Sequence, residues 1–352
     1  MYRIKWEHKR IVHEDAVDYL EKILRQLVQA FIDAAVHIKD PKYKTMRLVD
    51  MLVGIQMILS ISYEMPVKTK VNQVIKYYNY LIHKCNLTAN AAMAKMQDIE
   101  FKANTFQEMF KNSYPNIRVC NEAYIALQAV LGLILSDLFN TFSFQNVRNG
   151  YKLDFVKSVI DKTISYRNMF YRHKYEPTSI EMEALPPLTK SIYDNLISKI
   201  RGTCKRVAPD AMQHIQSLAA GLLNRILKII HKDTKCSHDY DYLYTVLHKN
   251  MLANQLLTQC YESWFENNDI SLKTIVEQFK KDTKIQHETI VIWINMLSDP
   301  QAPILNESTI WMIHLIVESY IINILDKSCT YAKYMQRAII TRKYIEVVME
   351  YV

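Results

Sequence analysis

The chain repeats one pattern of apolar spacing, in which a long amphipathic helix is followed by a polar loop and a shorter helix. From about His13 to Lys39, apolar residues recur every three or four positions, which is the spacing of one face of an α-helix. The pair Asp40-Pro41 ends this helix, because proline cannot continue the hydrogen-bond ladder. A basic loop at 42–45 and a short helix at about 47–59 are predicted to follow.

The same order returns three more times. Long helices are predicted at about 121–144, at 210–231 and from 306 through at least 325. Asp210 and Asn306 are the predicted N-caps of the last two, because their side chains can accept hydrogen bonds from free N–H groups. Short helices are predicted on both sides of these long helices, at 105–112 and 153–164, at 188–200 and 239–248, and at 288–297 and 341–352.

The predicted architecture is therefore all-α, with four repeats of a short helix, a long helix and a short helix. The spacing is too irregular for a solenoid of fixed period. The stretch 260–284 mixes acidic and basic residues and is typical of an exposed linker. The predicted boundaries are 1–65 for repeat one, 66–100 for a helical connector, 101–165 for repeat two, 166–187 for a linker, 188–250 for repeat three, 251–286 for a connector and 287–352 for repeat four.

Composition narrows the class of protein. Only 5 Gly and 9 Pro in 352 residues argue against a doubly wound α/β enzyme, whose phosphate loops and tight turns need glycine. A hydrophobic fraction of 49% excludes a disordered chain. A net charge of +8 favours anionic partners such as nucleic acid.

The chain offers no pattern that predicts catalysis, a metal or a cofactor. Six cysteines without a CxxC pair are typical of free thiols in a reducing compartment. His231, Cys236 and His238 lie close together, but their spacing fits no standard zinc site. We expect no signal peptide and no membrane span, since the longest apolar run, 123–138, contains Gln128 and Asp137.

A long helix flanked by two short ones cannot bury its own apolar stripe, whereas two such repeats crossed over each other can. This arrangement resembles the histone fold, in which two repeats pair in a handshake. In repeat one, KYKTMRLVDMLVGI resembles the loop and last helix of the smaller arginine-rich core histone, with Lys42, Lys44, Thr45 and Asp50 on matching positions. In repeat two, AYIALQAVLGLILSDLFNTFSF resembles the long helix of its larger arginine-rich partner, through 126–128 and 138–139.

Repeats three and four resemble the two lysine-rich core histones. Ser191-Ile192-Tyr193 is similar to the first helix of one of them. Residues 337–340 followed by Arg342 are similar to the Thr-Arg-Ile-Ile loop of the other, with the threonine replaced and one residue inserted. The chain as a whole resembles the fused histones of large DNA viruses, here a set of four.

The chain lacks the arginine–acid contact that is usual in the second loop of histones. In histones an arginine in the second loop clamps an acid seven residues later. Repeat one has Tyr43 where that arginine is expected, repeat two has Arg148 with Asp154 one residue closer, and repeat three has only Lys235 near Asp241. Long basic tails are also not visible.

The resemblance implies a function. It predicts two intramolecular handshake pairs, one with two and three with four, that package double-stranded DNA through its phosphates without reading sequence. Two chains would form an octamer-like core, in a virion and in a host nucleus or viral factory, with no membrane partner. The residues expected to contact DNA are Lys9, Arg10, Lys42, Lys44, Thr45, Arg47, Arg118, Arg148, Lys152, Lys205, Arg206, Lys232, Lys235, Lys333, Arg337, Arg342 and Lys343.

Three other classes of protein stay open. The first is a histone-fold scaffold of a transcription or virion assembly complex that wraps little DNA, which the missing tails and clamp arginine favour. The second is a helical structural protein whose likeness to histones is accidental. An enzyme comes last.

Overall fold

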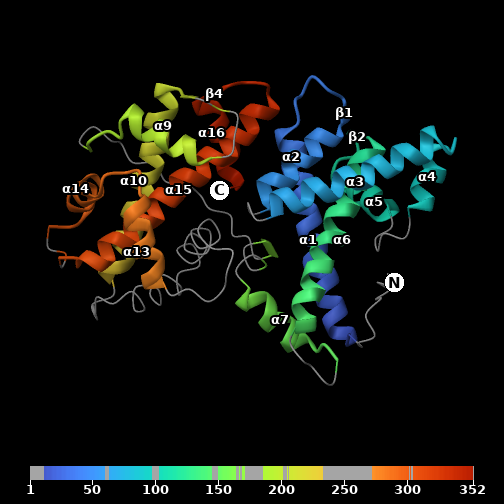
Figure 1. Cartoon of the computed structure of the whole chain (residues 1–352), viewed down its shortest axis with the longest axis horizontal. Helices are drawn as coiled ribbons and strands as arrows, with labels where there is room; N and C mark the ends of the chain where they lie inside the picture. The colour runs from blue at the N-terminus through green and yellow to red at the C-terminus, as the bar shows by residue number, and fades with distance from the viewer. Residues whose placement is uncertain are drawn as a thin grey trace. The chain divides into compact units, whose positions relative to one another are not determined.

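The computed structural model confirms the all-α class over the residues that it describes (Figure 1). The chain divides into two compact units, Met1–Arg172 and His173–Val352, which we describe separately as the N-terminal and the C-terminal unit. The described residues are 12–59, 63–96, 103–144, 150–163, 166, 169–170, 185–200, 204, 206–232, 272–300, 302 and 304–351.

The N-terminal unit is built on two long helices, α1 and α6, and both follow the predicted apolar stripes. Figure 1 places α2 with β1 and β2 toward one end of these helices and α7 toward the other. The elements in chain order are α1 (Glu14–Ile38), β1 (Thr45–Met46), α2 (Leu48–Ile58), α3 (Glu64–His83), α4 (Ala89–Lys95), α5 (Ala103–Ser113), β2 (Arg118–Val119), α6 (Asn121–Phe144) and α7 (Leu153–Lys162).

Two short parallel pairings join the ends of this unit. At one end, β1 pairs with β2, with Thr45 opposite Arg118 and Met46 opposite Val119. At the other end, Val12 forms a parallel bridge with Tyr151. Each pairing thus connects the segment that precedes one long helix with the segment that follows the other.

The C-terminal unit has the same kind of pairing between α10 and α15. β3, before α10, lies parallel to β4, after α15, in a register that sets Arg206 opposite Ile339 and Val207 opposite Ile340. The elements are α9 (Lys190–Lys199), β3 (Arg206–Val207), α10 (Pro209–Lys232), α13 (Leu272–Asp282), α14 (His287–Leu297), α15 (Glu307–Tyr334), β4 (Ile339–Ile340), α16 (Arg342–Val348) and the 3-10 helix η2 (Met349–Tyr351).

Some predicted helix ends differ from the structure. Asn306 caps α15 as predicted, since its side-chain oxygen accepts a hydrogen bond from the Thr309 N–H at 2.8 Å. Asp210 does not cap α10, because the helix begins one residue earlier, at Pro209, and proline is well suited to the first helical position. The predicted helix at 239–248 lies outside the described residues.

Two segments predicted as connectors contain helices with buried faces. The expectation of an exposed linker across 260–284 is wrong for α13, which buries Ile275, Val276 and Phe279 and contacts α15. In the segment 66–100, α3 packs along α6. Both helices bury apolar residues at helical spacing, and in α13 the mixture of acidic and basic residues obscured this pattern.

The helices α6 and α15 are largely buried, and Asp137 of α6 has hydrogen-bond partners. Among the described residues, these two are long and apolar enough to cross a membrane by length and composition, contrary to the expectation from the sequence. Yet 67% and 72% of their apolar windows are buried within the structure. Asp137 of α6 accepts hydrogen bonds from the hydroxyls of Tyr63 at 2.6 Å and Tyr166 at 2.9 Å. We therefore assign both helices to the cores of their units.

Two glycines in core helices should respond oppositely to alanine. At Gly54 of α2, an added Cβ would lie 2.6 Å from the backbone nitrogen of Ala35 in α1, whereas at Gly132 of α6 it would meet no atom within 4 Å. Gly54→Ala should destabilise the N-terminal unit by about 1–3 kcal/mol through overpacking. Gly132→Ala should stabilise it by up to about 1 kcal/mol through helix propensity. Denaturant unfolding of both variants checks this, and equal shifts would contradict it.

Candidate nucleic-acid interface

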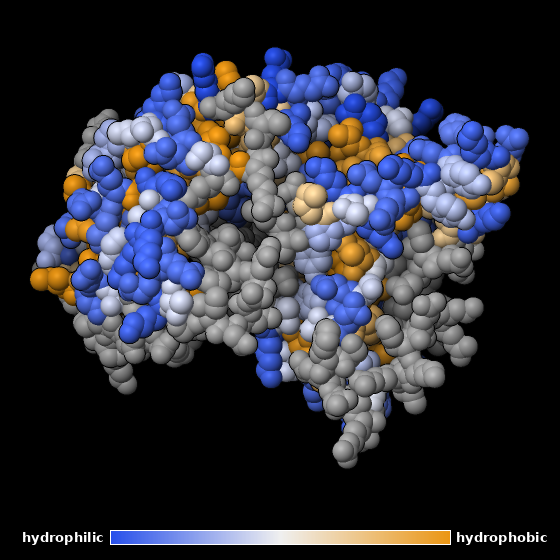
Figure 2. Space-filling view, in the orientation of Figure 1, coloured by the Kyte–Doolittle hydropathy of each residue, from blue (hydrophilic) through white to orange (hydrophobic). Residues whose placement is uncertain are grey.

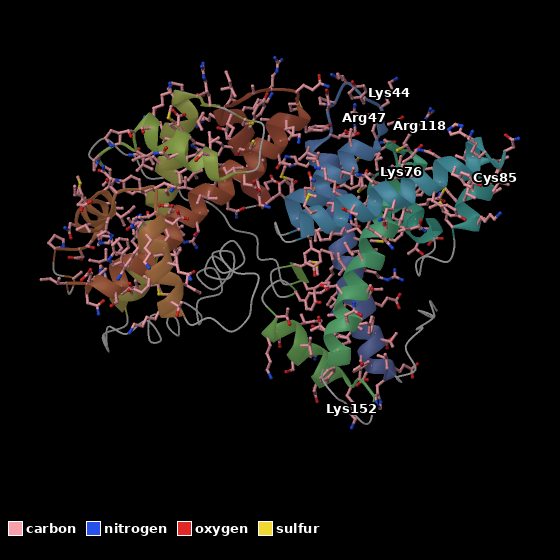
Figure 3. The ribbon with its side chains drawn as sticks, in the orientation of Figure 1. Lys44, Arg47, Lys76, Cys85, Arg118 and Lys152 are labelled. Atoms are coloured by element: carbon pink, nitrogen blue, oxygen red, sulfur yellow. The ribbon has the colours of Figure 1, made fainter. Side chains whose placement is uncertain are left out.

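One candidate site lies at the β1–β2 pairing, where two loops distant in sequence meet. Lys44 precedes β1 and is exposed, and Thr45 lies opposite the exposed Arg118 in the register. Neither Lys44 nor Arg118 forms an ion pair with any residue that the structure describes. Figure 3 shows both residues, with Arg47, gathered at the same end of the N-terminal unit. Two of the predicted cations from separate repeats are thus brought together.

Arg47 has a partner within the chain. Its guanidinium Nη2 lies 2.7 Å from Oδ1 of Asp50, its backbone N–H donates to Oδ2 at 2.7 Å, and its Cζ lies 3.8 Å from the ring centroid of Tyr43. Asp50 is fully buried, while the Arg47 side chain is 36% exposed. Arg47, the residue before α2, thus holds the buried Asp50 through both its backbone and its side chain.

Lys42 also has a carboxylate partner. Its Nζ lies 3.0 Å from Oδ2 of Asp40 on the exposed tip of the loop. The side-chain hydrogen bond between the two lowers the pKa of Asp40 and raises that of Lys42. The Lys42 side chain is 66% exposed and the Asp40 side chain 17%, so the lysine stays accessible to solvent beside its partner.

The opposite end of the N-terminal unit presents Lys152. The His13 N–H donates to the Tyr151 carbonyl at 3.1 Å, next to the Val12–Tyr151 bridge. Lys152 follows directly, exposed at the N-cap of α7, and Figure 3 shows it far from Lys44. Lys9, Arg10 and Arg148, predicted for the same end, lie outside the described residues.

The β3–β4 pairing forms a third basic site, in the C-terminal unit. The exposed Arg206 lies in β3, and the Ala208 N–H donates to the Ile340 carbonyl at 2.9 Å. Arg342 is exposed at the start of α16 and pairs with Glu346 at 2.8 Å. The predicted residues Lys333, Arg337 and Lys343 are also exposed.

A tight helix end positions Arg337. Gln336 adopts φ 56°, in the left-handed region that usually favours glycine. The Arg337 N–H donates to the Ala332 carbonyl at 2.8 Å and the Gln336 N–H to the Lys333 carbonyl at 3.0 Å. This pair of bonds ends α15 and directs the chain into β4.

Two cysteines tie the β3 loop to α15. The Cys204 N–H donates to Sγ of Cys329 at 3.3 Å, and both residues are buried. The hydrogen bond from Cys204 lowers the pKa of the Cys329 thiol to about 7, while the same pairing raises that of Cys204. The pair holds together the two segments that carry Arg206 and Lys333.

Several of the other residues predicted to bind DNA or zinc lie outside the part of the chain that the structure describes. Lys205 and Lys235 are not described, nor is the side chain of Lys232 at the end of α10. Of the three residues considered for zinc, only His231 is described. Among the described residues, no group of three His, Cys, Asp or Glu side chains could hold a metal ion.

Sequence reasoning missed a further set of cations on α3. The segment 65–97, nearly all of which lies in the predicted connector, contains no Asp or Glu. The absence of acidic residues from 65–97 is the sequence feature that indicates a basic surface there. The set comprises Lys68, Lys70, Lys76 and Lys84, all exposed.

Comparison of the chain with protein-family models, curated proteins and solved structures finds no match.

Proposed function

We propose that this chain is a DNA-packaging protein of four histone-like repeats, paired within the chain as one with two and three with four. The observation that carries the proposal is the set of parallel pairings at β1–β2, Val12–Tyr151 and β3–β4. Each joins the loop before one long helix to the loop after another, as a handshake of histone folds requires. The short-long-short order of α5, α6 and α7 and of α14, α15 and α16 supports it as well.

The pairings provide the chemistry for backbone binding. They collect cations from two repeats at one place, such as Lys44 with Arg118, and present them on exposed loops. Flexible cations on loops bind phosphates without recognising bases. In our proposal each unit holds an arc of duplex DNA through such loops, and two copies of the chain supply eight repeats.

Nuclease protection tests the proposal. The purified chain is mixed with long random-sequence duplex DNA at low and at physiological salt and then digested with a non-specific nuclease. We expect a discrete protected length, and we expect Lys44→Gln with Arg118→Gln to weaken binding and to reduce the slope of log Kobs against log salt by about 2. Uniform degradation at both salt concentrations would overturn the proposal.

A scaffold with little DNA wrapping is the second candidate. It is favoured by the carboxylates that already neutralise three of the predicted cations, since Lys42, Arg47 and Arg342 pair with Asp40, Asp50 and Glu346. The same digestion separates the two candidates, because a scaffold leaves the DNA unprotected.

A further inference from the structure

One face of α3 is strongly basic and has no counterpart among the predicted DNA contacts. Lys68, Lys70 and Lys76 lie in α3 and Lys84 directly follows it, while the acid of this helix is Glu64 at its first residue. The solvated face of a helix normally mixes both signs of charge.

The opposite side of α3 fixes the orientation of this basic face. Val67, Val71, Tyr78 and Leu81 are buried, and α3 packs along α6. Helical spacing therefore turns Lys76, Tyr77, Tyr80 and Lys84 to solvent, and we call these four residues the α3 basic face. Tyr77 and Tyr80 are 49% and 54% exposed.

The α3 basic face places two stacked tyrosines beside its lysines. The rings of Tyr77 and Tyr80 lie nearly parallel, at 15°, with centroids 6.5 Å apart. Neither Lys76 nor Lys84 forms an ion pair with a described residue. Figure 2 shows a mostly hydrophilic surface over α3 and α4. The lysines are therefore available to an anion, and the tyrosines add rigid contact area beside them.

The face continues the β1–β2 site. The Asn121 amide donates to the Tyr78 hydroxyl at 3.4 Å, so the C-terminal half of α3 lies beside the first turn of α6. Arg118, in β2, precedes that turn by three residues. Figure 3 shows Lys76 near the group formed by Lys44, Arg47 and Arg118. The α3 basic face and the β1–β2 site are thus linked through the first turn of α6, which also carries Glu122 near Tyr78.

We propose that the α3 basic face binds the phosphate backbone of duplex DNA, next to the stretch held by the β1–β2 loops. This inference rests on the proposed function and extends the path of the DNA onto a helix outside the four repeats. Lys76 and Lys84 neutralise phosphates, and the hydroxyls of Tyr77 and Tyr80 donate hydrogen bonds to phosphate oxygens. The contact is independent of base sequence.

The salt dependence of DNA binding by the full chain tests this proposal. Lys76→Gln with Lys84→Gln should reduce the slope of log Kobs against log salt by about 1.8, since each phosphate contact contributes about 0.9. The matched control is Lys273→Gln with Lys281→Gln, which removes two exposed lysines of α13 in the other unit and should leave the slope unchanged. Glutamine and lysine have similar helix propensity, so circular dichroism of both variants should match that of the wild type.

A second variant addresses the tyrosines. Tyr77→Ala with Tyr80→Ala should weaken binding severalfold without changing the slope, because no charge is lost, and unchanged affinity would overturn their part in the contact. If the wild type binds DNA and the Lys76→Gln, Lys84→Gln variant keeps its full slope, the α3 proposal is wrong while the proposed function stands. If the wild type shows no salt-dependent binding, both are wrong.

Discussion

Replacing Glu318 with alanine should lower the free energy of unfolding of the C-terminal unit by about 3–5 kcal/mol, because three partly or fully buried donors lose one shared acceptor. Glu318 lies on α15 and is fully buried. Its carboxylate accepts hydrogen bonds from the Thr283 hydroxyl at 2.6 Å and from the backbone N–H groups of Lys284 and Ile285, each at 3.0 Å. These donors form the turn between α13 and α14, which the carboxylate holds against α15.

Hydrogen exchange with mass spectrometry over 272–297 measures this effect locally. The amides of Lys284 and Ile285 should be protected in the wild type and exchange rapidly in Glu318→Ala. The control is Glu346→Gln, which removes an exposed carboxylate paired with Arg342 and should change stability by less than about 0.5 kcal/mol. Equal effects of the two substitutions would contradict the role of Glu318 as a clamp.

The stability that Glu318 contributes should depend on pH. Burial raises the pKa of Glu318, but hydrogen bonds from His314, Thr283 and the Ile285 N–H outweigh it and hold the pKa below its ordinary value of 4.5. A carboxyl with a lowered pKa in the folded state contributes its full stability above that ordinary value and loses it as pH falls further, through the folded-state pKa. The difference in unfolding free energy between wild type and Glu318→Gln should therefore shrink below pH 4.5.

The effect of pH on Glu318 should be measured as the difference between wild type and Glu318→Gln, because His287 also makes the stability depend on pH. Burial lowers its pKa, and the neighbouring His314 lowers it further. A histidine with a lowered pKa destabilises the fold as pH falls through its ordinary value of 6.5, because the unfolded state binds more protons. Both proteins carry His287, so subtracting their curves largely removes this effect.

The helices could be predicted from the sequence because their signal is local. The predicted bounds of α6 agree with the structure, and those of α1 differ by one residue at each end, since an apolar stripe of period 3.6 extends over six or more turns. Asn306 was predictable as a cap because its partner, Thr309, is three residues away. Local spacing carries such information whatever the tertiary fold.

The pairings that build the candidate site could not be predicted from local sequence patterns. Thr45 and Arg118 are 73 residues apart, and two-residue strands leave no alternating pattern to detect. The Glu318 clamp was not predicted at all. Its donors are 33–35 residues away, and a single glutamate on a helix is more often solvated. Tertiary packing decides such contacts.

The role of Arg47 shows an intermediate case. The spacing of Arg47 and Asp50, three residues at the start of a helix, permits an ion pair on local grounds. The resemblance to histones instead predicts the arginine at position 43, which is a tyrosine in this chain. In the structure the Tyr43 ring packs on the guanidinium of Arg47, so both residues support the contact with Asp50.

Replacing Asp50 with alanine should destabilise the N-terminal unit by about 2–4 kcal/mol. The change removes a fully buried acid that accepts from the backbone N–H of Arg47 and from its guanidinium, at 2.7 Å each. Breaking a buried ion pair costs about 3–5 kcal/mol, and the partial exposure of Arg47 to water reduces that loss. Denaturant unfolding followed by hydrogen exchange in α1 and α2 measures it.

A double-mutant cycle separates the pair from the helix cap. Arg47→Ala removes the guanidinium but keeps the backbone N–H bonded to Asp50, so its cost should be smaller than that of Asp50→Ala. The coupling energy of the two substitutions should reach about 1–3 kcal/mol. Glu21→Ala, which breaks the exposed pair with Arg25, should cost less than about 0.5 kcal/mol. Additive effects at Arg47 and Asp50 would show that the acid acts only as a cap, and that repeat one lacks a clamp.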